Sequence, residues 1–477
     1  MTINKQIQFV KGSAILVLSN LIIKGVNFFL LPLYTKYLTP EILGVSDTIS
    51  TFTSMVFPIL VMGLDSAFSA FYFDKKSPIY QHKVFNTVWW TLLFVSSIPI
   101  IMAIASKYIS ILLFGTGEYT LLIGIALVSV SMNIWYLPFA IYVRVENRML
   151  LFSVVNFISS LSMIMLNITF LSLLKIGVYS LILSATIVNM IQVILYLKLS
   201  GIKPKISNYD RNLSKQMLKY SLPLIPNVVA TWILNMSDRY IVLYFCGEGD
   251  VGLYGIAARF GTMVSLVANG VYMAYTTYAF DKKNDSDAPK QYARILNAFT
   301  FTVLIICFTG SLFSKEIISI MTEKSYINSY LLLCPILFSQ LLYGINTIVG
   351  YAMGFAKKTK YIFIATTVGA VINIALNFML IPRFGVIAAA YTTLISFAIM
   401  TIITYIFAQK LYFVEYKIYR IIISILITLC VTIIITELSF VIKITVWIIV
   451  CVLMIMMYKQ VISDYLKILK SIILKRK

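Results

Sequence analysis

Charged residues are scarce in this chain, and histidine is almost absent. Asp, Glu, Lys and Arg together make up 12% of the 477 residues, and His82 is the single histidine. Soluble globular proteins carry about twice that share of charge, so this class is excluded. A lone histidine in a short loop also lacks the partners that orient a catalytic base, which argues against acid–base catalysis there.

Fingerprints of nucleotide and metal binding are missing as well. The chain has no Walker motif and no dinucleotide fingerprint, so ATP bound by this chain is not expected to drive its activity. The five cysteines, at positions 246, 307, 334, 430 and 451, lie in or at the end of apolar segments without metal-ligand spacing. We predict packing roles for them, no metal site and no cofactor.

What the chain has in abundance is apolar residues, which form 60% of it at a mean hydropathy of +0.91. About fourteen apolar runs reach the roughly 20 residues that cross a hydrocarbon core. They lie near 11–38, 42–72, 84–106, 119–143, 149–174, 176–198, 216–246, 251–279, 291–314, 327–355, 359–381, 384–409, 418–437 and 441–458. The runs lack the short alternation of barrel strands, so we predict an all-α integral membrane protein with about 14 transmembrane helices.

The net charge of +21 is explained by membrane topology without nucleic acid. If both termini are cytoplasmic, roughly 29 of the 39 Lys and Arg residues fall in cytoplasmic segments. This is the positive-inside pattern of a multi-pass protein with an even number of spans. The basic tail from Lys459 to Lys477 is either a solvated terminus or a segment that lies on anionic lipid head groups.

An internal repeat appears when the chain is shifted against itself by about 208 residues. Asn27 then aligns with Asn235, and Gly44 aligns with Gly252. Six spans per repeat predict two pseudo-symmetric six-helix lobes related by an axis along the membrane normal. The predicted divisions are a first lobe at 1–200, a cytoplasmic linker at 201–213, a second lobe at 214–410, and two extra helices with a basic cytoplasmic tail at 411–477.

Polar side chains recur at helical spacing inside several of these apolar spans. Lys24 lies about 20 Å into the membrane, where an ammonium group must face water or a partner. The candidates on the first, second, seventh and eighth spans are Asn20, Lys24, Asn27, Asp47, Asn235, Asp238, Arg239 and Arg259.

Two interpretations of these side chains stay open. In the first, Asp47 and Asp238 pair with the basic residues and lock helices together. In the second, the side chains line a water-filled, partly cationic vestibule that binds an anionic group, with the two aspartates tuning its charge or carrying a coupling proton or sodium ion. Aromatic and amide side chains at Trp135, Tyr136, Gln340, Tyr343 and Asn346 are candidate sugar contacts, although most aromatic residues of such a chain only pack.

Three segments carry a family resemblance. They are Leu38–Gly44, the run Asn-Met-Ser-Asp-Arg-Tyr at 235–240, and Val251–Gly255. Together with twelve repeated spans plus two, they resemble the Wzx-type O-antigen and polysaccharide flippases. That superfamily also holds the multidrug and toxin extruders and the lipid II flippases. The resemblance covers nearly the whole chain, and its motifs are diffuse.

The resemblance implies translocation of an undecaprenyl-diphosphate-linked oligosaccharide from the cytoplasmic to the periplasmic leaflet of a bacterial inner membrane. Lys24, Arg239 and Arg259 would attract the diphosphate or acidic sugars. The implied partners are the lipid-linked oligosaccharide, membrane lipids, a polysaccharide polymerase and a chain-length regulator. The chain departs from many relatives at Ser66–Phe73, where they carry an arginine and it has no base.

Other function classes remain as alternatives. A multidrug/cation antiporter is disfavoured because Lys24, Arg239 and Arg259 outnumber Asp47 and Asp238, which favours an anionic substrate. A lipid II flippase fits the same features. A membrane glycosyltransferase or polymerase is disfavoured because the acidic triplet at 285–287 lies in a short loop and every predicted loop is shorter than about 20 residues.

Overall fold

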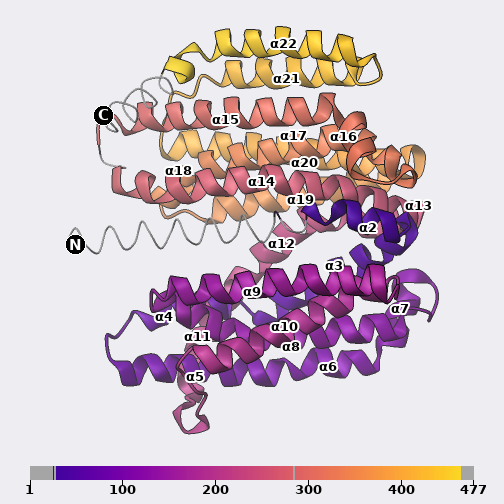
Figure 1. Cartoon of the computed structure of the whole chain (residues 1–477). Coiled ribbons are helices and arrows are strands. Elements are labelled where there is room, and N and C mark those ends of the chain that lie inside the picture. The colour runs from indigo at the N-terminus through magenta and orange to yellow at the C-terminus, as the bar shows by residue number, and fades with distance from the viewer. Residues whose placement is uncertain (1–24, 26–27, 283–284, 464–477) are drawn as a thin grey trace, which may run out of the picture. The chain divides into compact units, whose positions relative to one another are not determined.

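The computed structural model describes residue 25 and residues 28–282 and 285–463, which contain helices and no strand (Figure 1). Thirteen helical segments of this part are long and apolar enough to cross a membrane. They correspond to the predicted spans from the second to the fourteenth. The predicted first span, 11–38, lies mostly outside the described residues, which include its end as α2 (Leu31–Tyr37). The predicted all-helical membrane fold is confirmed.

Two compact units divide the chain, Met1–Gly252 and Leu253–Lys477. After α2, the helices of the first unit are α3 (Pro40–Val61), α4 (Leu64–Tyr72), α5 (Pro78–Val95), α6 (Ser97–Ile104), α7 (Ser106–Phe114), α8 (Thr120–Val145), α9 (Met149–Ile168), α10 (Tyr179–Leu199), α11 (Arg211–Ser221), α12 (Ile225–Met236), α13 (Asp238–Cys246) and the start of α14 (Glu248–Lys282). The lobe boundaries inferred from the repeat stay a prediction, because the two units meet inside α14.

The second predicted span, 42–72, consists of two helices that meet at a bend. Met62 and Gly63 both adopt left-handed backbone angles, with φ of 55° and 66°, which end α3 and start α4. A Cβ atom on Gly63 would lie 3.0 Å from the carbonyl oxygen of Ser221, so the end of α11 packs against this bend. Glycine therefore meets both the conformational and the steric demand of the position.

The repeat-related glycines Gly44 and Gly252 lie at a close helix crossing within the first unit. A Cβ atom on Gly44 would lie 1.8 Å from the carbonyl oxygen of Glu248, and one on Gly252 would lie 2.0 Å from that of Pro40. The start of α3 and the start of α14 thus touch backbone to backbone.

The predicted linker packs onto α5 through polar contacts. Asp210 caps α11 by accepting hydrogen bonds from the backbone N–H groups of Asn212 (2.8 Å) and Leu213 (3.1 Å). Its carboxylate also pairs with Lys83 of α5 at 2.7 Å. The hydrogen bond from Lys83 and the helix N–H groups hold the pKa of Asp210 below its ordinary value, because they favour the charged form.

The second unit continues α14 and contains α15 (Ala288–Leu312), α16 (Ser314–Met321), α17 (Tyr330–Val349), α18 (Tyr351–Phe355), α19 (Lys360–Phe384), α20 (Val386–Leu411), α21 (Ile418–Ile435) and α22 (Phe440–Met457). α21 and α22 form a hairpin against α15 (Figure 1). Its turn is held by ion pairs of Lys443 with Glu316 (2.7 Å) and of Lys315 with Glu437 (2.9 Å).

The surface of both units is apolar where the spans lie. Isoleucine and leucine side chains on α21 and α22 are examples: Ile434 is 70% exposed, Ile449 is 61% exposed and Leu426 is 56% exposed. Water would not tolerate apolar surface of this extent on a monomer, whereas lipid tails do. The chain is therefore a multi-pass membrane protein.

Candidate functional site

Polar side chains of α3 bond to the backbone of their own helix, and one of them also joins α3 to α12 within the first unit. Thr51 donates its hydroxyl to the carbonyl of Asp47 at 2.7 Å, and Ser54 donates to the carbonyl of Thr51 at the same distance. The indole N–H of Trp232 on α12 then donates to the Ser54 hydroxyl at 2.9 Å. This bond brings α3 and α12 into contact at Ser54, and the common lining predicted for spans two and seven stays a prediction.

Asp238 and Arg239 form a buried pair where α12 ends and α13 begins. The Asp238 side chain is 1% exposed and accepts a hydrogen bond from the Arg239 backbone N–H at 2.9 Å. The Arg239 guanidinium Nη1 lies 3.9 Å from the same carboxylate oxygen and donates to the Asn235 carbonyl at 3.3 Å. The carboxylate also sits at the first residue of a helix, where the macrodipole favours negative charge. Because the two residues are neighbours on α13, this contact is local and joins no two helices, so both interpretations of the pair stay predictions.

Two polar atoms near this pair have no hydrogen bond to the described part of the chain. They are the buried side-chain oxygens of Ser237 and Tyr240, which lie within two residues of the pair in the sequence. A buried polar oxygen is stable only where water or another polar group reaches it. The end of the stripe around Asp238 is therefore a polar environment inside an apolar unit.

The remaining cationic candidates lie on the first and eighth predicted spans. Lys24, Asn20 and Asn27 lie outside the described residues, so their place beside the stripe stays a prediction. Arg259 lies on α14 in the second unit and is half-buried.

α17 carries the candidates Gln340, Tyr343 and Asn346. A Cβ atom on Gly261 would lie 3.4 Å from Cγ of Gln340, which places Gln340 against the helix that carries Arg259. The Asn346 side-chain oxygen is buried and has no hydrogen bond to the described residues. Tyr343 packs edge-on against Phe397, with ring centroids 5.7 Å apart. A sugar role for these three side chains stays a prediction.

Trp135 and Tyr136 on α8 make contacts that serve packing. The Trp135 indole N–H donates to the Ser96 hydroxyl at 2.6 Å, at the bend between α5 and α6. Tyr136 stacks on Tyr196 with ring centroids 6.0 Å apart. These contacts explain both residues structurally, and a sugar role for them stays a prediction.

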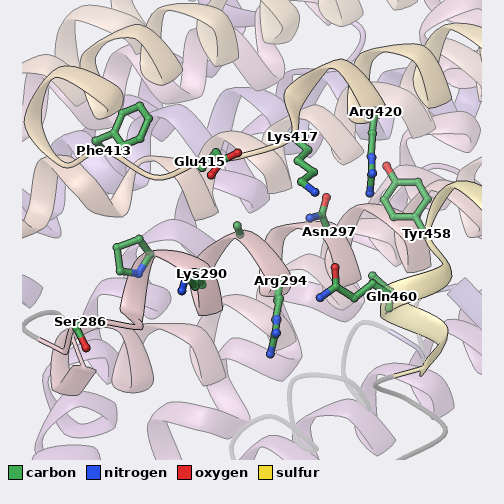
Figure 2. A pocket seen from close by; sticks show the side chains of 13 residues that line it. Ser286, Lys290, Arg294, Asn297, Phe413, Glu415, Lys417, Arg420, Tyr458 and Gln460 are labelled. Carbon is green, nitrogen blue, oxygen red and sulfur yellow. The ribbon is translucent and has the colours of Figure 1, made fainter.

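A basic pocket in the second unit was missed by the sequence reasoning. It has a volume of about 420 Å³ and lies between the start of α15, the start of α21 and the end of α22 (Figure 2). Its cationic lining residues are Lys290, Arg294, Lys417 and Arg420, and its one carboxylate is Glu415. In the sequence, all four cations lie within two helical turns of the end of a span. The positive-inside rule accounts for cations at such positions, so nothing in the sequence indicated a pocket.

Metal ligation finds no support in the described residues, which hold no group of three or more His, Cys, Asp or Glu side chains able to bind an ion. Asp287 of the acidic triplet is exposed and lies 3.8 Å from Lys290. In the described part of the chain, that triplet has the surroundings of a solvated turn.

Comparison with known families gives two matches. Residues 9–276 match the family described as polysaccharide biosynthesis protein. Residues 223–379 match the family described as MatE. The first match covers more than half of the chain.

Curated relatives are distant. A probable low-salt glycan biosynthesis flippase, Agl15 of Haloferax volcanii, is 24% identical over 204 residues, which are 42% of each chain. The match therefore spans about two fifths of that relative's length. An uncharacterized membrane protein of Methanocaldococcus jannaschii is 25% identical over 438 residues, and 84% of each chain is covered.

Solved structures share the fold over most of the chain. The lipid II flippase MurJ in an inward closed conformation superposes with a TM-score of 0.70 at 20% identity, covering 95% of this chain and 100% of that one. An inward-facing multidrug resistance MATE family transporter of the MOP superfamily gives a TM-score of 0.63 at 13% identity, covering 82% and 93%. At these identities the likeness establishes the fold.

Proposed function

The chain belongs to the polysaccharide biosynthesis protein family, and we propose that it is a flippase for an undecaprenyl-diphosphate-linked oligosaccharide. The substrate is the repeat unit of O-antigen or another surface polysaccharide, moved from the cytoplasmic to the periplasmic leaflet. The membrane is the bacterial inner membrane, and both termini are cytoplasmic. A polysaccharide polymerase and a chain-length regulator act on the product.

The observation that carries this proposal is the polar stripe of α3, α12 and α13. Asp47, Trp232, Asp238 and Arg239 all lie within or next to apolar spans, where polar side chains are costly and mark substrate or ion paths. An extended polar substrate with a lipid tail needs such a path for its sugars while the tail stays in the bilayer.

Alternating access follows from the repeat. Two lobes related by an axis along the membrane normal expose a central site to either side when they rock. Within the first unit, the starts of α3 and α14 pack backbone to backbone at Gly44 and Gly252. In this mechanism Lys24, Arg239 and Arg259 attract the diphosphate or acidic sugars.

Energy coupling is assigned to the aspartates. A proton or a sodium ion bound at Asp47 or Asp238 would change the charge of the stripe between the two orientations. The leaflet gradient of substrate alone is the alternative driving force.

Multidrug extrusion is the second candidate function. The match of residues 223–379 to the MatE family favours it, as does the buried carboxylate of Asp238, which suits a cationic substrate. A lipid II flippase would share the fold and the anionic substrate, and would differ in the sugar that it carries.

Deletion of the gene in its host distinguishes these functions. The assay combines mass spectrometry of lipid-linked oligosaccharides with staining of surface polysaccharide and efflux of cationic dyes. A flippase predicts loss of surface polymer with repeat units trapped on the cytoplasmic side. Persistence of the polymer together with reduced dye efflux would replace the flippase by the drug extruder.

Complementation with variants tests the role of the Asp238–Arg239 pair. Arg239→Gln is expected to abolish complementation, whereas Arg383→Gln, an exposed cation at another span end, is expected to complement fully. If Arg239 only neutralises Asp238, the double variant Asp238→Asn with Arg239→Gln will restore transport. If Arg239 holds substrate, the double variant stays inactive at normal expression.

Lys24 is tested in the same assay. Lys24→Ala should abolish transport at normal expression, whereas Lys24→Arg keeps the charge and should retain it. Full activity of the alanine variant would exclude Lys24 as a substrate ligand.

A further inference from the structure

The basic pocket of the second unit has a charge imbalance that the opposite end of the same helices lacks. At the far end of α15, α21 and α22, Lys443 pairs with Glu316 and Lys315 pairs with Glu437. At the pocket end, four cations and one carboxylate, Glu415, line the cavity, and one of the four, Lys290, pairs with the exposed Asp287 at 3.8 Å. None of Arg294, Lys417 and Arg420 has a salt bridge to the described residues.

The pocket lies at the depth of lipid head groups. α15 begins at Ala288, α21 begins at Ile418 and α22 ends at Met457, so three membrane spans terminate around it. Arg294 is about 9 Å along the helix axis from the first residue of α15, and Arg420 is in the first turn of α21. Lys417 and Arg420 extend from the start of α21 towards Asn297 of α15 (Figure 2).

The floor of the pocket is ordered. Tyr458 is 3% exposed, shares a hydrogen bond with the Ser424 hydroxyl at 3.1 Å, and packs against Phe301. Gln460 and Asn297 add uncharged groups that can hydrogen-bond to a ligand. A volume of about 420 Å³ is in the range of small-ligand sites, which is about 300–1,000 Å³.

We propose that this pocket binds the phosphate-bearing head group of an anionic membrane phospholipid. The guanidinium groups of Arg294 and Arg420 provide hydrogen-bond donors whose geometry fits phosphate oxygens. The first two turns of α21 expose Tyr419, Ile422 and Ile423, at 58%, 51% and 45%, where the acyl chains of the same lipid can lie. A soluble anion would bind the guanidinium groups but would gain nothing from the exposed apolar side chains.

The site goes beyond the proposed transport activity. The bound lipid would join α15 to the α21–α22 hairpin at the end where no described ion pair does so. In the proposed orientation this end is cytoplasmic, the side on which anionic head groups attract basic residues most strongly. Binding is measured without transport, so the outcome is independent of the flippase proposal.

The test uses the full-length protein in neutral detergent. Native mass spectrometry records the number of bound lipids and the half-saturating concentration as phosphatidylglycerol is added, with phosphatidylcholine as the zwitterionic comparison. The wild type is expected to retain one phosphatidylglycerol selectively. The double variant Arg294→Gln with Arg420→Gln should weaken that binding about thirtyfold, since each cation near an anionic surface contributes about fivefold.

A matched control carries the same loss of charge outside the pocket. Lys358→Gln with Lys360→Gln removes two exposed cations at the same end of the second unit and should leave phosphatidylglycerol binding unchanged. Asn297→Asp adds a carboxylate to the pocket at nearly constant volume and should weaken binding without removing an arginine. It covers the case in which the arginine variant does not fold.

Two results would overturn the proposal. Equal weakening in the pocket and control variants would make the pocket part of a generally basic surface. Displacement of phosphatidylglycerol by an equal concentration of inorganic phosphate would assign the pocket to a soluble anion instead of a lipid.

Discussion

Replacing Gly44 with alanine puts a methyl group where the backbone of α14 already lies. The added Cβ would be 1.8 Å from the carbonyl oxygen of Glu248 and 2.7 Å from its carbonyl carbon. Neither atom is the far end of a flexible side chain, so the two helices must move apart. Overpacking of this kind costs about 1–3 kcal/mol, and contact with backbone places it at the upper end.

Helix propensity acts in the opposite direction. Alanine is favoured over glycine inside a helix by about 1 kcal/mol, so the expected net loss of unfolding free energy is about 2 kcal/mol. Gly124 of α8 serves as the control, because its added Cβ would meet the Ser106 hydroxyl oxygen at an ordinary 3.7 Å. Gly124→Ala should therefore be neutral or stabilising.

Equilibrium unfolding in mixed micelles with increasing dodecyl sulfate measures these differences. Gly252→Ala should resemble Gly44→Ala, because its Cβ would lie 2.0 Å from the Pro40 carbonyl oxygen. The double variant should lose less than the sum, since one separation of the helices relieves both clashes. A Gly44→Ala protein as stable as Gly124→Ala would refute the backbone contact between α3 and α14.

Three further predictions concern polar contacts. Lys443→Met breaks a pair whose lysine is 1% exposed and should lower the unfolding free energy by about 2–3 kcal/mol. The loss is smaller than for a fully buried pair because the Glu316 side chain is 30% exposed. Adding Glu316→Gln should recover most of the lost stability in the same micelle assay. Because the pKa of Asp210 is lowered in the folded protein, its ionised carboxylate stabilises the fold above the unfolded pKa of about 3.9, and this stabilisation is lost as the pH falls through the folded pKa. In an acid titration followed by circular dichroism, the wild type should therefore lose more stability than Asp210→Asn. Trp232→Phe removes the donor to Ser54 and should cost about 1 kcal/mol, a loss that is not repeated when Ser54→Ala is added; independent losses would contradict the hydrogen bond.

The membrane fold could be predicted from the sequence because its main constraint is local. A span needs about 20 consecutive apolar residues, and that length is visible in one window of the chain. Thirteen of the predicted spans therefore reappear among the described residues. The bend at Met62 and Gly63 was not predicted, because a single glycine inside an apolar run gives no sign of its backbone angles.

The candidate site was predictable in part. Helical spacing indicated that Asp47 and Asp238 lie on polar stripes, and α3 and α12 do share a hydrogen bond through Trp232 and Ser54. Spacing leaves open which charges pair, because that depends on the direction of each side chain. The burial of the Asp238 carboxylate, which is 1% exposed, and the hydrogen bond from the Arg239 guanidinium to the Asn235 carbonyl appear only in the structure.

By itself the sequence determined that this is a multi-pass helical membrane protein with an internal repeat, since hydropathy and self-similarity belong to the order of residues. Only the tertiary structure decided that Gly44 and Gly252 touch. It also decided that Arg294 and Arg420, far apart along the chain, line one pocket. The reason is that lipid tails are as apolar as the helix surfaces, so the choice of neighbours depends on the fit of packed side chains and on interhelical hydrogen bonds, which no local pattern records.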